Sequence, residues 1–395
     1  MATYPVKYLH SEMRGAPTLS GSAGALIGVL DACLTSGFGL TSVTALSVSS
    51  GVASATVGSG NSFEVGAIVL IDGATPGTLN GEQRVVSSSA TSFTFATAAS
   101  DGAATGTISA KYAPAHNWEK AYSGTNKGAY RSTDLEANGH YLRVDDTGTQ
   151  TAAVRGYESM SDVDTGTGPF PTTEQMSTAL WPKSMQSSAT AVRWMLFADA
   201  RFFGIAIAPY SYIDATSMSA PLRGFGDAVG LADGGDAWCT VLSCCSDVAY
   251  FHKSSLDSFT QAAIGDGAHA FARPLDGLGS SERAAMKCMA PFSSQANSFS
   301  GSDTGGFGTF PSAVDGKLRL AHNYLCSSVA NSPPRALVPG TYYAPWTNVG
   351  NYLTHGDVLA GSDDFAGRRL IAVGAGNSSG KPAGIYFMDA TGPWR

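Results

Sequence analysis

The chain has 395 residues, of which 14% are Asp, Glu, Lys or Arg, and its formal net charge is −7. A weakly acidic chain with so few charges has no basic surface of the kind that binds nucleic acid, so we expect no nucleic-acid partner. Gly fills 47 positions, and a chain rich in small residues but poor in Lys and Glu favours strands and turns over long exposed helices.

The first residues carry no signal for export or membrane insertion. The stretch "MATYPVKYLHSEMRG" lacks the apolar core of a signal peptide. The best apolar window, "AGALIGVLDACL" (residues 23–34), contains Asp31 and is too short to span a bilayer. We therefore expect synthesis in a cytoplasm and no membrane insertion.

Residues 1–40 predict a short extended piece followed by one helix that packs on a β-rich body. We expect the helix over residues 23–36, capped by Ser20 or Ser22 and ended by Gly37. Its apolar stripe at helical spacing is Leu26, Val29, Leu30 and Cys33.

Residues 41–113 predict a separate all-β module. The stretches "VTALSVSSGVASATV", "FEVGAIVLIDGA", "GEQRVVSSSATSFTFAT" and "ATGTISAKY" are rich in Val, Ile, Thr and Phe and are divided by turn residues. The pair Asn80-Gly81 predicts a tight turn. We expect a small antiparallel barrel or sandwich of about five to seven strands.

Residues 114–395 predict a larger, less regular domain that is also rich in strands. "AVRWMLFADARFFGIAIAPYSY" predicts two apolar strands joined near "ADAR", and "GRRLIAVGAGNSSGKPAGIYFMD" predicts a closing hairpin. Brief helices are expected at "TTEQMSTAL" and "SSERAAMKCM". The predicted fold class is therefore mainly β, with a small module, a larger β-rich domain and few short helices.

The triplet Asp-Thr-Gly begins at Asp146, Asp164 and Asp303. In aspartic proteases this triplet supplies two carboxylates that share one proton, and apolar strands flank each copy. Here Asp146 follows another acid, a proline closely follows Asp164, and Asp303 has no apolar strand before it. We interpret the triplets as turns, in which Asp accepts backbone N–H bonds and Gly supplies positive φ.

Other catalytic patterns lack the context that their chemistry needs. "GNSSG" makes Ser378 a nominal nucleophile, but a nucleophile elbow leads into a helix and here a strand is expected next. The stretches "GFGDAVG" and "GAGNSSG" have the wrong spacing for a phosphate loop. A distant carboxylate pair such as Asp162 with Glu174 stays open as a glycosidase alternative. We predict no catalytic residues and no cofactor.

The six cysteines predict buried packing rather than a metal centre. "WCTVLSCCSD" contains Cys239, Cys244 and Cys245 but no Cys-x-x-Cys pair of the zinc-binding type. A site made by these three thiols and His252 stays open as an alternative. Free Cys packs like a small apolar side chain, so we expect no metal.

Aromatic residues gather in the stretch "VPGTYYAPWTNVGNYL" (residues 338–353). Tyr and Trp are enriched at the centres of protein interfaces, and the low charge of the chain suits a surface that neighbours cover. The candidate interface residues are Tyr342, Tyr343, Trp346 and Tyr352. The alternative is that these rings pack inside their own domain.

The 41–113 module resembles a β domain of tailed-bacteriophage structural proteins. The resemblance lies in "GVASATV", "FEVGAIVLIDGATPGTLNGEQRVVS", "SFTFAT" and "ATGTISA". Pieces of the larger region resemble uncharacterised virion-associated proteins of phages and prophages, and together with the module they cover about half of the chain. These pieces are "VKYLHSEMRGAPTLSGSAGALIGVLDACL", "WEKAYSGTNKGAYRS", "YLRVDDTGTQTAAVRGYESMSDVDTGTGPFP" and "FMDATGPWR".

The resemblance implies a non-enzymatic structural protein of a tailed-phage virion, in the tail, baseplate or head–tail region. It implies contacts with other virion proteins and a homo-oligomer, or several copies around a symmetry axis. Two alternatives are a virion-associated cell-wall or polysaccharide hydrolase and a head decoration or receptor-binding protein. The expected location is the virion, after assembly in the cytoplasm of the bacterial host.

Overall fold

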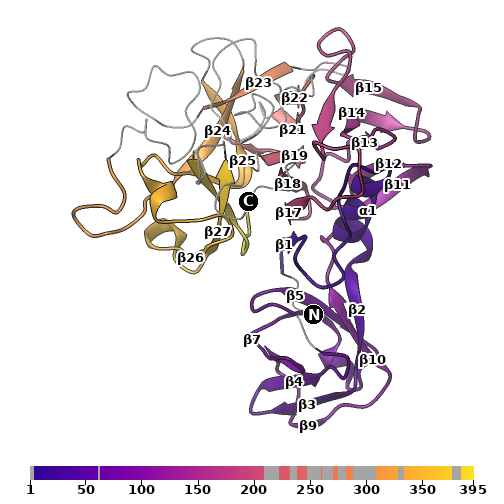
Figure 1. The fold of residues 1–395 in the computed structure, drawn as a ribbon, viewed down its shortest axis with the longest axis vertical. Coiled ribbons are helices and arrows are strands. Elements are labelled where there is room, and N and C mark those ends of the chain that lie inside the picture. The colour runs from indigo at the N-terminus through magenta and orange to yellow at the C-terminus, as the bar shows by residue number, and fades with distance from the viewer. Residues whose placement is uncertain are drawn as a thin grey trace.

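The computed structural model describes residues 4–60, 63–208, 222–231, 238–246, 259, 270–274, 282–287, 308–327, 333–375 and 384–395. These residues form four antiparallel sheets and few helices, which confirms the prediction of a mainly β chain. Figure 1 shows a small module at one end of an elongated molecule, with the two larger sheets side by side at the other end.

The small module consists of two open sheets, with strand orders β2-β10-β5-β6 and β7-β8-β4-β3-β9, and neither order closes into a barrel. Its strands are β2 (Phe38–Val43), β3 (Ala45–Ser49), β4 (Val52–Thr56), β5 (Ile68–Asp72), β6 (Gly81–Arg84), β7 (Ser87–Ser88), β8 (Ser92–Ala96), β9 (Gly102–Ala103) and β10 (Ile108–Tyr112). Alternate residues of β3 and β8 are buried, as expected when one face of a sheet packs on another.

An aromatic cluster joins the two sheets of the module. Phe63 makes edge contacts with Phe93 of β8 at 5.2 Å and with Tyr112 of β10 at 4.9 Å between ring centroids. All three side chains are buried. The two sheets therefore face each other as a sandwich, and the module begins at Phe38, slightly before the predicted boundary.

The tight turn predicted at Asn80-Gly81 is wrong. A longer loop joins β5 to β6, Asn80 is extended, and Gly81 begins strand β6. The Asn80 side chain closes this loop by accepting a hydrogen bond from the Ala74 N–H and donating one to the Ala74 carbonyl, both at 2.8 Å. Asn is used here for its side-chain amide rather than for a left-handed backbone.

The predicted helix begins later than expected and changes type along its length. An α-helix, α1 (Ala25–Leu30), continues as one wide π-helical turn over Asp31–Ser36 and ends at Gly37. Neither Ser20 nor Ser22 caps it; the N-cap residue is Gly24, whose side chain can make no capping bond. The predicted apolar stripe is buried, as expected for a helix docked on a β core.

A third sheet lies beside the helix, as Figure 1 shows for α1, β11 and β12. Its order is β11-β12-β13-β14-β15, with β16 also paired to β14. The strands are β11 (Trp118–Gly124), β12 (Lys127–Ser132), β13 (Tyr141–Asp145), β14 (Thr151–Met160), β15 (Gly166–Phe170) and β16 (Leu180–Pro182).

The largest sheet has the order β1-β17-β18-β19-β21-β22-β23-β24-β25-β28-β27-β26, with β20 also paired to β25. The N-terminal strand β1 thus pairs with β17, in the middle of the sequence. The strands are β1 (Lys7–His10), β17 (Arg193–Ala198), β18 (Phe202–Ala208), β19 (Leu222–Asp227), β20 (Val229–Gly230), β21 (Trp238–Ser243), β22 (Ala270–Pro274), β23 (Glu282–Lys287), β24 (Ala321–Ser327), β25 (Pro334–Tyr343), β26 (Val358–Ala360), β27 (Arg369–Ala375) and β28 (Gly384–Asp389).

Both predicted hairpins of the larger region are present. Strands β17 and β18 pair antiparallel across the turn at residues 199–201, and β27 pairs antiparallel with β28. The prediction of two brief helices is wrong. Residues 172–179 form turns before β16, and "ERAAMK" is strand β23, paired with both β22 and β24. Pairing with neighbouring strands on both sides outweighs the high intrinsic helix propensity of this stretch.

The third sheet packs against the largest sheet through large aromatic side chains. Phe203 of β18 meets Trp118 at 5.2 Å and Trp181 at 6.0 Å between ring centroids, both edge-on. All three belong to one apolar core that continues through α1 into the small module. Within the described ranges, no helix has the length and apolar character needed to cross a membrane.

Candidate functional site

Asp146, the acid of the first Asp-Thr-Gly triplet, caps helix α1. Its Oδ2 accepts hydrogen bonds from the backbone N–H groups of Leu26 at 2.7 Å and Ile27 at 3.3 Å. Its Oδ1 pairs with the Nζ of Lys183, which also donates to the Ser22 carbonyl at 2.7 Å. Both side chains of this ion pair are fully buried.

Two opposing effects act on the pKa of Asp146. Burial raises its pKa above the ordinary value, while the Lys183 ammonium and the two helix N–H groups favour the charged form. A carboxylate held by three donors inside the core is a structural cap, since it has no open side from which a substrate could be reached. The predicted turn role is wrong for Asp146, because its backbone N–H donors belong to helix α1 rather than to its own turn, and Gly148 of the triplet does not have a positive φ.

Asp164, the acid of the second triplet, lies on the surface. Lys127 donates to its Oδ1 at 2.8 Å and Arg143 pairs with the same oxygen at 2.5 Å, and these bonds lower the pKa of Asp164. Asp162 accepts the backbone N–H of Asp164 in the same turn, and Glu174 bonds within its own turn. Asp303 and Ser378 lie outside the described residues.

Three of the four candidate interface residues are buried inside their own chain. Tyr342 and Tyr343 lie on β25, between β24 and β28, and Trp346 donates its indole N–H to the Arg319 carbonyl at 2.9 Å. The interface prediction is wrong for these three, because β25 lies within the sheet and buries both tyrosine rings, while Trp346 packs in the same apolar cluster as Tyr342. Only Tyr352 is exposed, at 59%.

The cysteines that the structure describes in full are buried thiols that take part in no disulfide bond. They are Cys33, Cys244, Cys245 and Cys326. Burial raises the pKa of the Cys33 thiol well above its usual range. Among the described residues, no group of three or more His, Cys, Asp and Glu side chains could hold a metal ion. His252 of the three-Cys-one-His alternative lies outside the described part of the chain.

A cleft of about 600 Å³, which we call the Arg201 cleft, opens where loops of two sheets meet both ends of the described chain. Its walls come from the β17–β18 turn, the loop after β12 and the segment before β11. The lining residues are Tyr4, Pro5, His116, Asn117, Thr133, Asp134, Leu135, Glu136, Asp199, Ala200, Arg201, Pro393, Trp394 and Arg395.

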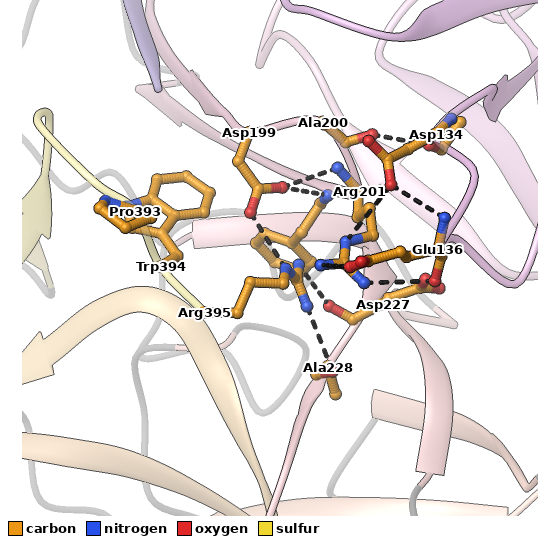
Figure 2. Close-up of polar contacts among 12 residues, drawn as sticks. Asp134, Glu136, Asp199, Ala200, Arg201, Asp227, Ala228, Pro393, Trp394 and Arg395 are labelled. Atoms are coloured by element: carbon orange, nitrogen blue, oxygen red, sulfur yellow. Dashed lines mark hydrogen bonds and ion pairs between the residues drawn. The ribbon is translucent and has the colours of Figure 1, made fainter. Parts of the chain in front are cut away.

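Two guanidinium groups organise the charges of this cleft, as Figure 2 shows. Arg201 pairs with Glu136 at 2.9 Å and lies 3.9 Å from a carboxylate oxygen of Asp134. Arg395 pairs with Asp199 at 3.2 Å and donates to the carbonyl of Asp227 at 3.0 Å. The cleft therefore contains paired positive and negative side chains, and its lining does not carry charge of one sign.

The β17–β18 turn supplies the floor of the Arg201 cleft. Asp199 accepts the backbone N–H groups of Arg201 at 2.8 Å and Phe202 at 2.6 Å, which is the usual role of Asp at the start of a turn. Trp118 donates its indole N–H to the Asp199 carbonyl at 2.8 Å. The turn is thus held by both the hairpin and the third sheet.

A second cleft of about 290 Å³, the His355 cleft, lies where β1 meets the small module and β26. His10 contacts Glu64 of the module at 2.9 Å, and the Gly374 backbone N–H donates to Nδ1 of His355 at 3.2 Å. Burial, with smaller contributions from Arg193 and His10, lowers the pKa of His355 to about 4. This ring is therefore neutral near pH 7 and acts as a hydrogen-bond acceptor.

Sequence reasoning missed both clefts. Their residues come from segments far apart in the chain, such as Asp199 with Arg395 and His10 with Glu64, and no local pattern marks such pairs. The turn signal "ADAR" did place Asp199 and Arg201 correctly in a hairpin loop. In comparisons with known proteins, no protein-family model matches this chain, and no curated protein matches it significantly.

Proposed function

We propose that this chain is a non-enzymatic structural component of a tailed-bacteriophage virion, in the tail, the baseplate or the head–tail region. The proposal starts from the resemblance of its segments to virion-associated proteins. One observation supports it most: the segments that carry this resemblance meet one another in the fold and form its joints. The segments that resemble virion proteins thus supply contacts that hold the parts of the fold together.

The first joint fixes helix α1. Asp146, from the segment 141–171, caps the helix from the segment 6–34. Asp31 of the same helical segment binds Lys120 at 2.9 Å and accepts the Tyr130 hydroxyl at 2.7 Å, both from the segment 118–132. Three resembling segments therefore converge on one short helix.

A second joint involves the segment 387–395. Gly392 has a positive φ of 64° and lies so close to Val6 that an added Cβ would come within 2.6 Å of a Val6 methyl. Only glycine fits this approach without a shift of the backbone. Trp394 is buried beside it and donates its indole N–H to the Asp389 carbonyl at 2.9 Å.

The small module is tied to the rest of the molecule by polar contacts of the same kind. Lys7 of β1 is almost fully buried and pairs with Glu82 of β6 at 2.9 Å. Arg369 of β27 donates to the Val65 carbonyl at 3.3 Å. A subunit whose parts are joined by one largely buried ion pair and further hydrogen bonds is suited to carry load between neighbours in a particle.

The proposal is tested by quantitative mass spectrometry of gradient-purified particles from a host that carries the encoding phage or prophage. We expect this chain at a fixed ratio of several copies per major tail or capsid protein. Its absence from purified particles would contradict the proposal.

The two alternatives predict different outcomes in separate assays. A cell-wall or polysaccharide hydrolase would release soluble sugars or peptides from host envelopes incubated with the purified chain. If the chain is a head decoration or receptor-binding protein, particles should still assemble when it is removed. If it is a tail or connector subunit that forms a joint, its removal should stop assembly.

A further inference from the structure

The Arg201 cleft has the size and position of a ligand site. Its volume of about 600 Å³ lies within the range of roughly 300–1,000 Å³ that is common for small-molecule sites. It is built from loops that rigid sheets hold in place, which is where binding residues are most often found. The structural role proposed above makes no use of it.

The charges of the cleft favour a neutral ligand. Asp134 and Glu136 face Arg201, and Asp199 faces Arg395, so each carboxylate already has a cation within ion-pair distance. A charged ligand would have to displace one of these partners. A neutral ligand can instead use the remaining carboxylate lone pairs and guanidinium N–H groups, because one carboxylate offers about four acceptor positions and one guanidinium five donors.

The rest of the lining of the cleft is partly apolar and also includes the polar residues His116, Asn117 and Thr133. Its apolar lining residues include the fully exposed Leu135 and the exposed Pro5 and Pro393. The Tyr4 ring also lines the cleft, and the guanidinium of Arg84 lies over this ring at 4.8 Å from its centroid. A ligand that fits must therefore combine an apolar face with hydroxyl groups around its edge.

The loop that presents Leu135 is held before any ligand arrives. Asp134 accepts the Glu136 N–H at 3.1 Å and the Asn117 side-chain amide at 2.8 Å, and Ser132 donates its hydroxyl to the Ala200 carbonyl at 2.6 Å. Because these bonds fix the loop, little conformational entropy is lost when a ligand contacts it.

We propose that the Arg201 cleft binds a neutral saccharide of two or three sugar units. A pyranose ring has C–H groups on its faces, which suit the Tyr4 and Leu135 side of the cleft. Its hydroxyl groups both donate and accept, which suits the paired carboxylates and guanidinium groups on the other side. Water-bridged contacts to Asn117 and His116 complete such a site. The inference is independent of the virion role.

Saturation-transfer NMR on the full chain tests this inference, with maltotriose, cellotriose and triacetylchitotriose as neutral probes and trilysine as a cationic probe. At about 5 mM of each probe, we expect transfer to at least one trisaccharide and none to trilysine. The Leu135→Arg variant should weaken saccharide binding by about tenfold or more, because the longer side chain fills the mouth of the cleft.

The matched control is Val314→Arg, which changes an equally isolated residue, 93% exposed, outside the lining of the Arg201 cleft. It should leave saccharide binding unchanged, and circular dichroism should be the same for both variants and the parent. Absence of transfer to all three trisaccharides overturns the inference. So does transfer that Leu135→Arg does not reduce, or binding of trilysine alone, which would identify a site for basic peptides.

Discussion

At the scale of single residues, the Asp-Thr-Gly triplet occurs in two different environments. Asp146 is buried and bonded to a helix terminus and an ammonium group, while Asp164 pairs with Lys127 and Arg143 at the surface. Both are turn acids in sequence, but only the first lies where removal of its charge would leave another charge unpaired in the core.

Replacement of Asp146 by Ala should destabilise the fold strongly. The change removes the cap of α1 and leaves the Lys183 ammonium buried without its carboxylate, and breaking a buried pair in this way costs about 3–5 kcal/mol. Urea denaturation followed by circular dichroism measures the loss. The control Asp164→Ala should shift the midpoint little, because exposed ion pairs contribute little. Equal shifts for the two variants would show that the buried pair has no special role.

His355 should make stability depend on pH. Its pKa of about 4 in the fold, against an ordinary value of 6.5, means that the unfolded chain binds a proton first as the pH falls. Stability is therefore complete above about pH 6.5 and decreases towards pH 4, by up to about 3 kcal/mol. His140 and His322 also have lowered pKa values and add to the same slope.

Denaturation midpoints of the parent and of His355→Gln, compared between about pH 7 and pH 4, check this prediction. The Gln side chain cannot be protonated in this range, so the variant should show a shallower slope. The exposed His116, changed to Gln, is the control. An unchanged slope in His355→Gln would mean that this ring does not contribute.

At the scale of elements, residues 38–113 should fold without the rest of the chain. Their two sheets enclose Phe63, Phe93 and Tyr112, and all strand pairs of the module lie within this range. We expect the isolated fragment to be soluble and to unfold cooperatively, as monitored by far-UV circular dichroism and amide exchange. A disordered fragment would show that Lys7 and the other contacts to the body are needed for folding.

Strands of the module could be predicted because one face of each sheet is buried, which leaves alternation in the sequence, as in β3 and β8. The start of α1 could not be predicted from the sequence, because its cap comes from Asp146, which is 120 residues away from Leu26. Strand β23 could not be predicted either, because this Ala-rich stretch forms a strand by pairing with its neighbours β22 and β24.

The aromatic cluster at residues 338–353 shows a different limit of prediction. Large rings suit both protein interfaces and domain cores, and composition alone does not separate the two. Tyr342 packs edge-on against Phe365 at 4.6 Å between ring centroids, inside the chain, whereas Tyr352 remains exposed. The pairing of β25 with β24 and β28 decides which rings are buried.

At the scale of the whole molecule, three bodies are joined by a few buried polar contacts and one continuous apolar core. The small module, the third sheet and the largest sheet meet around β1 and α1, near the middle of Figure 1. Asp31, Asp146 and Gly392 make contacts at these joints, and they lie in segments on which the proposed virion role is based. The proposal of a structural role starts from this arrangement.

The most direct test of this account is electron microscopy of phage particles labelled with gold-conjugated antibodies against this chain. We predict label at one fixed position along the tail or at the head–tail junction, with several copies arranged around the particle axis. Particles that carry no label, or label scattered without a fixed position, would contradict the proposal of a structural virion subunit.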